Sequence, residues 1–326
     1  IVKGELRGKT VEANSYYDRY TREEEKLVSY KEKGGFYRHI YSLPCRWRRA
    51  KYHDKVVRAY QQGFDAPALL NNSEVIVSLT TFPPRISQLH LVLKSILWQT
   101  YVPADIIVWL SEQEFPGRLN DLPEELRKLT ANGVKFKFVP ENFRSHKKYY
   151  YVFREYPDHK VITVDDDLIY PRNTIERLLS LSYQYPDTVC GNVIRKIRMD
   201  GNTFSVYRKW PKVFMMPVNS SLQNVAIGCG GIYYPSRWYG EELFDWKIIS
   251  EHCPSADDLW LKANELKRRI NVTGGGEFYP RPIELPQTQN NSLQKKNNGK
   301  INLNDKQWKS LNELWKLDEL YCINGK

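Results

Sequence analysis

Three consecutive aspartates, Asp165, Asp166 and Asp167, follow a short apolar run that ends at Val164. Like charges this close repel each other, and carboxylates at the end of a buried strand lose hydration, so we expect a cation beside them. Side chains two residues apart in an extended chain point to the same side, so Asp165 and Asp167 can face one divalent ion. Mg²⁺ is typically held by one or two carboxylates, completed by phosphate oxygens and water. The pattern therefore predicts a metal and diphosphate site; the alternative is a loop of aspartates that caps a helix opening at Pro171.

A second acid pair, Asp257 and Asp258, opens a segment with helical periodicity at residues 256–269. A carboxylate that faces a substrate from this position could act as a general base. The alternative is ordinary helix chemistry, because Ser255 suits an N-cap and acids stabilise the first turn of a helix. The residues alone leave both interpretations open.

Adjacent glycines stand at Gly230 and Gly231, within the run Gly-Cys-Gly-Gly-Ile-Tyr-Tyr-Pro at residues 228–235. Glycines before a strand allow positive φ and a close approach of the backbone to a ligand. The pair is therefore a candidate for the acceptor or sugar pocket, and a tight turn is the alternative.

A cationic run, Arg-Ser-His-Lys-Lys at residues 144–148, separates the third candidate strand from a candidate helix. Arg144, Lys147 and Lys148, together with free amides at the helix start, could hold phosphate. A solvated charge run is the alternative.

Four short apolar segments, residues 74–79, 105–110, 134–139 and 160–164, are candidate strands that must position these side chains. Candidate helices lie between or after them, at residues 86–97, 123–129, 145–155 and from Pro171 onward. Nearly continuous apolar strands alternating with helices predict an α/β protein whose mostly parallel sheet is covered on both faces. Ligands of such sheets bind beyond the carboxyl ends of the strands. We therefore expect Thr80, Thr81, residues 111–112 and the three aspartates on one rim.

In this order the segments resemble bacterial nucleotide-sugar glycosyltransferases of the GT-A fold, particularly those that build capsule or lipopolysaccharide chains. The resemblance rests on Thr-Thr-Phe-Pro-Pro-Arg-Ile at 80–86, the cationic run, the aspartates with Tyr-Pro at 170–171, the glycine run, and Ala-Asp-Asp-Leu-Trp at 256–260. It covers about residues 73–285. It implies a GT-A-like, Rossmann-type domain with helical extensions at both ends.

The resemblance also implies roles for individual residues. Thr80, Thr81, Pro83 and Arg85 would contact the nucleotide, as would Asp166 and the cations of residues 144–148. Asp165 would bind the ribose, and Asp167, with Asp165, a Mn²⁺ or Mg²⁺ ion and the diphosphate. Asp258 is favoured over Asp257 as the base, although many relatives carry Glu at the position of Asp257.

The implied reaction is metal-dependent transfer of a sugar from a UDP- or GDP-linked donor to a hydroxyl of a glycan or glycolipid. A single displacement, with a base on the acceptor side, would invert the stereochemistry at the anomeric carbon. Lys147 or Lys148 would help to neutralise the departing nucleoside diphosphate.

Composition narrows the class of protein. The 326 residues are 41% hydrophobic, which is enough for a full core and excludes a mainly disordered chain. No run approaches the roughly 18 consecutive apolar residues of a membrane-spanning helix. Five scattered cysteines fit neither a disulfide framework nor a zinc site, which favours a reducing compartment. No G-x-S-x-G, P-loop or G-x-G-x-x-G run occurs.

The net charge of +11 is concentrated in the flanks. Residues 1–70 carry 15 Lys and Arg against 9 Asp and Glu, whereas residues 71–291 carry 27 against 25. A neutral main body argues against a nucleic-acid partner. Basic residues around Trp47 predict an amphipathic helix that lies on an anionic membrane surface; solvated helix faces are the alternative. The expected location is the cytoplasm, with peripheral attachment to the inner face of the membrane.

Three segments are expected: a basic helical extension at 1–72, broken at Gly34-Gly35 and Pro44, a GT-A domain at 73–286, and a polar linker with a C-terminal helix at 287–326. The chain begins with Ile rather than Met, which indicates a piece of a longer protein. One rival function is a haloacid-dehalogenase-type phosphatase, which also places D-x-D after a strand, though usually after the first one. The other is a non-catalytic adaptor bound to membrane or nucleic acid.

Overall fold

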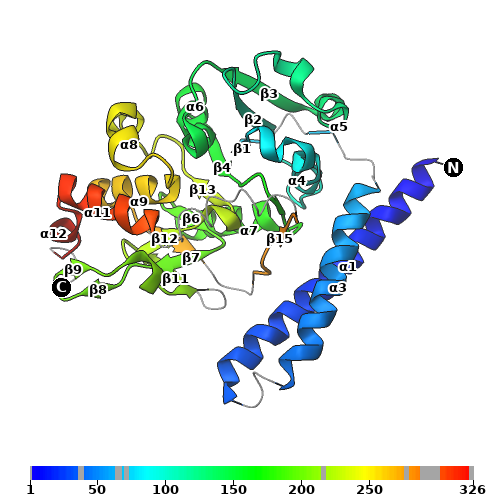
Figure 1. The fold of residues 1–326 in the computed structure, drawn as a ribbon, viewed down its shortest axis with the longest axis horizontal. Coiled ribbons are helices and arrows are strands. Elements are labelled where there is room, and N and C mark those ends of the chain that lie inside the picture. Colours follow the sequence, from blue (N-terminus) through cyan, green and yellow to red (C-terminus); the bar gives the residue numbers. More distant parts are fainter. Residues whose placement is uncertain are drawn as a thin grey trace.

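An eight-stranded sheet forms the centre of the molecule (Figure 1). The computed structural model describes residues 2–35, 40–62, 68–69, 73–213, 218–274, 279–286 and 302–322. Along the sheet the strands lie in the order β11-β14-β6-β13-β4-β1-β2-β3. Their bounds are β1 (Val75–Thr80), β2 (Asp105–Ser111), β3 (Val134–Val139), β4 (Lys160–Thr163), β6 (Val189–Gly191), β11 (Val218–Ser221), β13 (Ile232–Tyr234) and β14 (Val272–Gly274).

The half of the sheet from β4 to β3 is entirely parallel, since β1 pairs with β4 and β2, and β2 pairs with β3, in the same direction. β13 runs antiparallel to both β4 and β6, and β14 is parallel to β6. The fold class expected from the sequence is confirmed: a mostly parallel sheet flanked by helices, with helical segments at both ends. The division into three domains stays a prediction.

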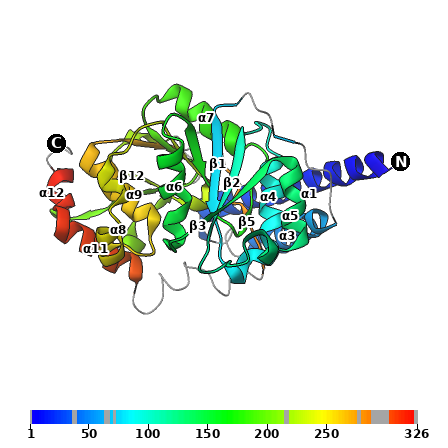
Figure 2. The same ribbon diagram turned by 90° about the horizontal axis from the view of Figure 1, so that it is seen from above.

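Alternating side chains of the strands build a separate core on each face of the sheet. In β1, Val77 and Leu79 belong to the core under α4 and α7, whereas Ile76 belongs to the core under α6 and α9. These helices are α4 (Leu89–Leu97), α7 (Thr174–Gln184), α6 (Lys147–Glu155) and α9 (Asp257–Arg268). The first turns of α6 and α9 line the cavity near the carboxyl ends of the parallel strands, and Figure 2 shows α6 beside β1 and α9 on the side of α6 away from β1.

Shorter elements complete the fold around the sheet. Three strands, β7 (Ile194–Lys196), β10 (Lys212–Val213) and β12 (Asn224–Ala226), form an antiparallel sheet in the order β10-β7-β12. Two further antiparallel pairs are β5 (Leu168–Ile169) with β15 (Ile283–Glu284), and β8 (Met199–Asp200) with β9 (Thr203–Phe204). The other α-helices after β1 in the described residues are α5 (Glu124–Lys128), α8 (Trp246–His252), α11 (Leu303–Trp315) and α12 (Leu317–Cys322). Short 3₁₀ segments are η1 (Pro83–Gln88), η2 (Arg118–Asp121), η3 (Leu129–Asn132), η4 (Arg144–His146), η5 (Tyr207–Lys209), η6 (Gly228–Gly230) and η7 (Glu241–Phe244).

Two long antiparallel helices, α1 (Val2–Lys33) and α3 (Ser42–Gln61), form a helical hairpin that projects from the body (Figure 1). Ion pairs join the two helices, Arg48 to Glu23 at 3.0 Å and Arg49 to Glu24 at 2.9 Å. No helix in the described part of the chain is both long enough and apolar enough to cross a membrane.

The middle of this hairpin rests on the β5–β15 pair, directly behind the aspartate run. The buried Tyr17 hydroxyl donates to the carbonyl of Ile169, at 3.1 Å, and His53 Nε2 lies 2.9 Å from the carbonyl of Glu284. The N-terminal helices therefore support the segment that carries the aspartates, which the sequence did not indicate.

Two expectations about prolines are corrected. Pro44 does not break a helix but lies in the first turn of α3, where a missing N–H costs no intrahelical hydrogen bond. Pro171 does not open α7, which begins three residues later at Thr174 after Asn173 as N-cap. Gly133 ends the segment before β3 in the left-handed conformation, with φ of 96°, which glycine adopts without strain.

Candidate functional site

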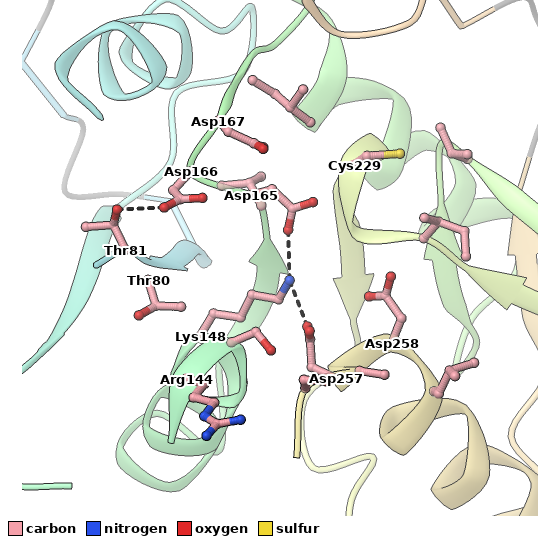
Figure 3. Close-up of a pocket in the computed structure, with 18 of the residues that line it drawn as sticks. Thr80, Thr81, Arg144, Lys148, Asp165, Asp166, Asp167, Cys229, Asp257 and Asp258 are labelled. Carbon is pink, nitrogen blue, oxygen red and sulfur yellow. Dashed lines mark hydrogen bonds and ion pairs between the residues drawn. The ribbon is translucent and has the colours of Figure 1, made fainter. Parts of the chain in front are cut away.

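A cavity of about 600 Å³ opens at the carboxyl ends of β1 and β4. Most of the residues that the sequence predicted as functional line it, as Figure 3 shows for ten cavity residues. The predicted residues in its wall are Thr80, Thr81, Arg85, Arg144, Lys147, Lys148, Asp165, Asp166, Asp167, Asp257 and Asp258. Segments separated by almost 180 residues in the sequence thus meet in one concave site.

The Lys148 ammonium joins the two acid motifs across this cavity. Its Nζ lies 2.9 Å from Asp165 Oδ1 and 2.8 Å from Asp257 Oδ2, and its side chain is only 6% exposed (Figure 3). Burial alone would lower the pKa of Lys148, but the charges of Asp165, Asp257 and Asp258 hold it well above its ordinary value. Lys148 therefore stays a cation, and it ties the end of β4 to the start of α9.

Hydrogen bonds fix the backbone around Lys148. Ser78 Oγ in β1 donates to the carbonyl of Lys148 at 2.5 Å. The ring of His146 is fully buried between the Tyr149 hydroxyl and the carbonyl of Cys253, each 2.9 Å away. Burial lowers the pKa of His146 to about 4, so the ring is neutral and does not bind phosphate. His146 instead links the loop before α6 to the loop before α9.

Arg85 compensates the other two aspartates. Its guanidinium forms ion pairs with Asp166 and, at 3.1 Å, with Asp167 Oδ2, and Thr81 Oγ1 donates to Asp166 Oδ2 at 2.6 Å. The cation that crowded carboxylates require is thus supplied largely by the protein itself. Burial nevertheless raises the pKa of Asp167 to about 7, with Arg85 opposing and the other aspartates adding to the shift.

Asp258 differs from its neighbour because no cation pairs with it directly among the described residues. Its Oδ2 accepts a hydrogen bond from the backbone N–H of Gly228 at 3.1 Å, and its buried Oδ1 has no partner there. Burial and the charge of Asp257 raise the pKa of Asp258 to about 8, with Lys148 opposing. By contrast, burial would raise the pKa of Asp257, but Lys148 and His146 outweigh it and lower the pKa. At neutral pH Asp257 is therefore ionised, whereas Asp258 releases its proton only at about pH 8.

Gly228 is the glycine that makes a close approach at this site. A Cβ atom there would lie 3.0 Å from Asp165 Oδ1 and 3.2 Å from Lys148 Nζ. The predicted glycines are placed differently: a Cβ at Gly230 would meet Val193 at 2.7 Å, Gly231 adopts φ of 77°, and neither lines the cavity.

Several other residues predicted from the sequence to be functional lie outside the cavity or bind partners other than the expected ligand. Lys147 is 1% exposed and binds Glu114 and Asn142, so Lys148 alone of the two lysines bridges the acids. Pro83 and residues 111–112 do not line the cavity. Ser255 is not the N-cap of α9, because Ala256 occupies that position and Ser255 binds Gln307 of α11.

Several side chains that line the cavity were not predicted from the sequence, and some of them belong to the three-stranded sheet β10-β7-β12 or lie next to it. The missed side chains include Glu114, Arg195, Tyr207, Lys212, Cys229, Tyr279 and Arg281. Glu114 follows the second strand, so its place at the carboxyl end of the sheet could have been predicted in the same way as that of the aspartates. The strands that carry Arg195 and Lys212 are only three and two residues long, so their periodicity gives no signal.

The described residues do not provide a complete metal site on their own. No group of three or more His, Cys, Asp or Glu side chains that could hold an ion occurs among them. Asp165 and Asp167 also have ion-pair partners, Lys148 and Arg85. A hard cation bound by one or two carboxylates takes its other ligands from phosphate and water. The residues therefore fit a metal that binds together with a diphosphate.

No protein-family model and no curated protein matches the chain. Solved structures resemble part of its fold. TarS from S. aureus in complex with UDP is 15% identical over 63% of this chain and 59% of its own, with a TM-score of 0.40. The mannosyltransferase PcManGT from Pyrobaculum calidifontis, in complex with GDP-Man and Mn²⁺, is 12% identical over 70% and 62%, with a TM-score of 0.37. A putative nucleotide-diphospho-sugar transferase from Desulfovibrio desulfuricans G20 is 13% identical over 76% and 98%, with a TM-score of 0.36. The chain thus spans about three-fifths of TarS, and likenesses of this strength assign no activity.

The split of the acid pair predicts opposite effects of two neighbouring substitutions on stability. Folded Asp258 keeps its proton up to about pH 8, whereas the unfolded chain releases it near the ordinary pKa of 3.8. The free energy of unfolding of the wild type therefore falls as the pH rises between these values, whereas that of Asp258→Asn does not, because asparagine carries no titrating proton. Its gain in unfolding free energy should be near zero at about pH 4, rise to several kcal/mol at pH 8, and stay constant above.

Asp257→Asn is the matched control, because it leaves Lys148 with one carboxylate fewer. We expect it to destabilise the fold by about 3 kcal/mol near pH 7. Denaturant unfolding across this pH range measures both effects. A gain for Asp258→Asn that does not change with pH would show that Asp258 does not titrate near pH 8.

Proposed function

We propose that this chain is a glycosyltransferase of the GT-A type, which moves a sugar from a nucleoside-diphosphate sugar to a hydroxyl of a glycan or glycolipid. The observation that carries the proposal is the Asp165–Lys148–Asp257 bridge, beside the titrating Asp258, in a cavity at the ends of parallel strands. One acid motif would serve the donor and the other the acceptor, and the lysine sets the distance between them.

The donor would lie on the side of the cavity formed by Thr80, Thr81 and the aspartates. Arg144 stands exposed at the rim with φ of 50°, a left-handed conformation that costs about 1 kcal/mol and is common at ligand sites. Its guanidinium and Lys148 are the cations suited to the leaving diphosphate. Asp167, with Asp165, would hold Mn²⁺ or Mg²⁺ when the donor is present. The ion would stabilise the negative charge that develops on the leaving group.

Asp258 is the proposed general base. The acceptor hydroxyl oxygen forms a bond to the anomeric carbon as the bond from that carbon to the diphosphate oxygen breaks, and the proton passes to Asp258. This single displacement inverts the stereochemistry. Asp257 is unsuited to the role because its ion pair with Lys148 keeps its basicity low. The N–H of Gly228 positions the Asp258 carboxylate.

A direct test combines nucleotide binding with transfer. We expect UDP or GDP to raise the Tm, and Asp258→Asn to keep that response while transfer falls at least about 100-fold. Because the base must be deprotonated, kcat/KM should rise with pH through a pKa of about 8. Retained transfer in Asp258→Asn would remove the base assignment. No response to any nucleotide, with a phosphoenzyme formed instead, would favour the phosphatase.

Metal binding should depend on the nucleotide, since the aspartates already have ion-pair partners. We expect Mn²⁺ to bind the free protein at least about tenfold more weakly than the protein with UDP or GDP, because the diphosphate supplies ligands. Asp167→Asn should abolish this coupling and leave the fold intact, whereas Glu114→Gln, another cavity acid, should keep it. Titration calorimetry with Mn²⁺ measures both. Tight Mn²⁺ binding without nucleotide, unchanged in Asp167→Asn, would contradict the assignment.

We also propose that the tip of the α1–α3 hairpin rests on an anionic membrane surface, which suits a cytoplasmic enzyme of capsule or lipopolysaccharide synthesis. Leu43 and Trp47, one turn apart on α3, are 62% and 66% exposed, and Ile40 is exposed beside them. Arg46 and Lys51 are exposed next to this apolar patch and form no ion pair with the described residues. Apolar side chains flanked by unpaired cations match the chemistry of an anionic bilayer surface.

Vesicle binding tests the hairpin tip. The protein should co-sediment with phosphatidylglycerol vesicles but not with phosphatidylcholine vesicles, and Leu43→Ala with Trp47→Ala should weaken binding about tenfold. Tyr183→Ala is the control, because this side chain is 69% exposed on α7, away from the hairpin. Equal binding of the double variant, or preference for RNA over vesicles, would refute the proposal.

A further inference from the structure

Two cations face each other on neighbouring strands in the cavity wall. Arg195 in β7 and Lys212 in β10 are direct partners in the antiparallel register, and both line the cavity. Residues opposite each other in such a pair point to the same face, and like charges in this arrangement destabilise the sheet. Repulsion of this kind persists in a fold when an anion normally relieves it.

Most cavity cations are compensated by a carboxylate, but these two are not. Arg85, Lys147, Lys148 and Arg281 each form an ion pair within the described residues. Arg195 and Lys212 form none there, and the exposed Arg144 at the rim is likewise without one. Desolvation lowers the pKa of Lys212; Cys229 and Glu284 act to raise it, and the charges of Arg195 and Arg281 act to lower it.

Arg195 is held in place rather than left to move in solvent. Its Nη1 donates to the carbonyl of Trp210 at 2.7 Å, and its guanidinium lies 4.6 Å from the centre of the Tyr207 ring. Its Nε is buried and has no hydrogen-bond partner among the described residues. A fixed guanidinium with an unused donor is preorganised to bind an oxyanion.

The pair belongs to the acceptor side of the cavity. Arg195 is also the register partner of Val225 in β12, and that strand leads to Gly228, whose N–H donates to Asp258, the proposed base. In Figure 3, Cys229 and Asp258 lie across the cavity from Thr80 and Arg144, on the far side of Lys148. A nucleotide bound against Thr80 and Arg144 would leave the Arg195–Lys212 pair for a second charged group.

We propose that Arg195 and Lys212 form an anion-binding subsite, which holds a phosphate or carboxylate group carried by the acceptor or by the transferred sugar. This inference rests on the proposed function for the location of the donor. It adds a substrate class, because either the acceptor or the transferred sugar would carry a negative charge. Neutralising the cation pair would then contribute to substrate selection.

Titration with inorganic phosphate tests the subsite without knowledge of the substrate. We expect phosphate to raise the Tm of the wild type, and Lys212→Gln and Arg195→Gln to bind phosphate at least about tenfold more weakly. Lys212→Glu would place opposite charges across the strands, so its Tm without phosphate should rise by about 1 °C or more and no longer respond to phosphate. Lys209→Gln is the control, because Lys209 is exposed and pairs with Asp200 at 3.2 Å. Equal phosphate binding in all variants would overturn the proposal.

Repeating the titration with saturating UDP or GDP identifies the source of the anion. Phosphate should still bind to the nucleotide complex, and the affinity for the nucleotide alone should stay within about twofold in Lys212→Gln. If Lys212→Gln weakens nucleotide and phosphate binding equally, the pair serves the leaving diphosphate and the second anion is refuted. Two transfer assays then show which substrate carries the anion. One pairs an acidic sugar donor with a neutral acceptor, and the other pairs a neutral sugar donor with an acidic acceptor. If no nucleotide binds, the proposed function fails, and the loss of phosphate binding in the variants still reports the subsite.

Discussion

The arrangement of the site depends on one buried ammonium. Lys148 stands between Asp165 at the end of β4 and Asp257 at the start of α9, within 3 Å of each, and is almost inaccessible to water. Removing one partner of such a buried pair leaves an uncompensated charge, which costs several kcal/mol. The lysine therefore fixes the separation of the two motifs that the sequence places about ninety residues apart. Ser78 and His146 hold the backbone on which it stands.

Five carboxyl groups crowd into this space, and the protein treats them unequally. Arg85 and Lys148 form ion pairs with four of them, whereas Asp258, with a pKa raised to about 8, has only a backbone N–H as its partner among the described residues. Two neighbouring carboxyls with different environments can thus take different roles, one structural and one chemical. Elsewhere in the cavity wall the imbalance has the other sign, since Arg195 and Lys212 form no ion pair among the described residues. The cavity is therefore acidic where a proton must be taken up and cationic where a charged substrate would enter.

Much of the fold could be predicted from the sequence, because apolar runs before Thr80 and Asp165 are characteristic of parallel strands whose ends share one rim. Because the carboxyl ends of parallel strands lie at one edge of the sheet, the sequence correctly placed the aspartates and the threonines together. It could not show that Arg85 and Lys148 would form ion pairs with these aspartates, because ion pairs between distant segments leave no local pattern. Arg195 and Lys212 were missed for a related reason: strands of two or three residues have no measurable period. The support of β5 by Tyr17 and His53 likewise depends on tertiary contacts alone.

The proposed chemistry requires that Lys148 keep Asp257 ionised while Asp258 titrates at about pH 8. Carboxyl ¹³C NMR of aspartate-labelled protein measures this directly. We predict a resonance with a midpoint at about pH 8 that disappears in Asp258→Asn, while Asp257 stays ionised below its ordinary pKa. If the resonance near pH 8 persists in Asp258→Asn, or if both residues titrate together near pH 4, the division of roles proposed for this pair is wrong.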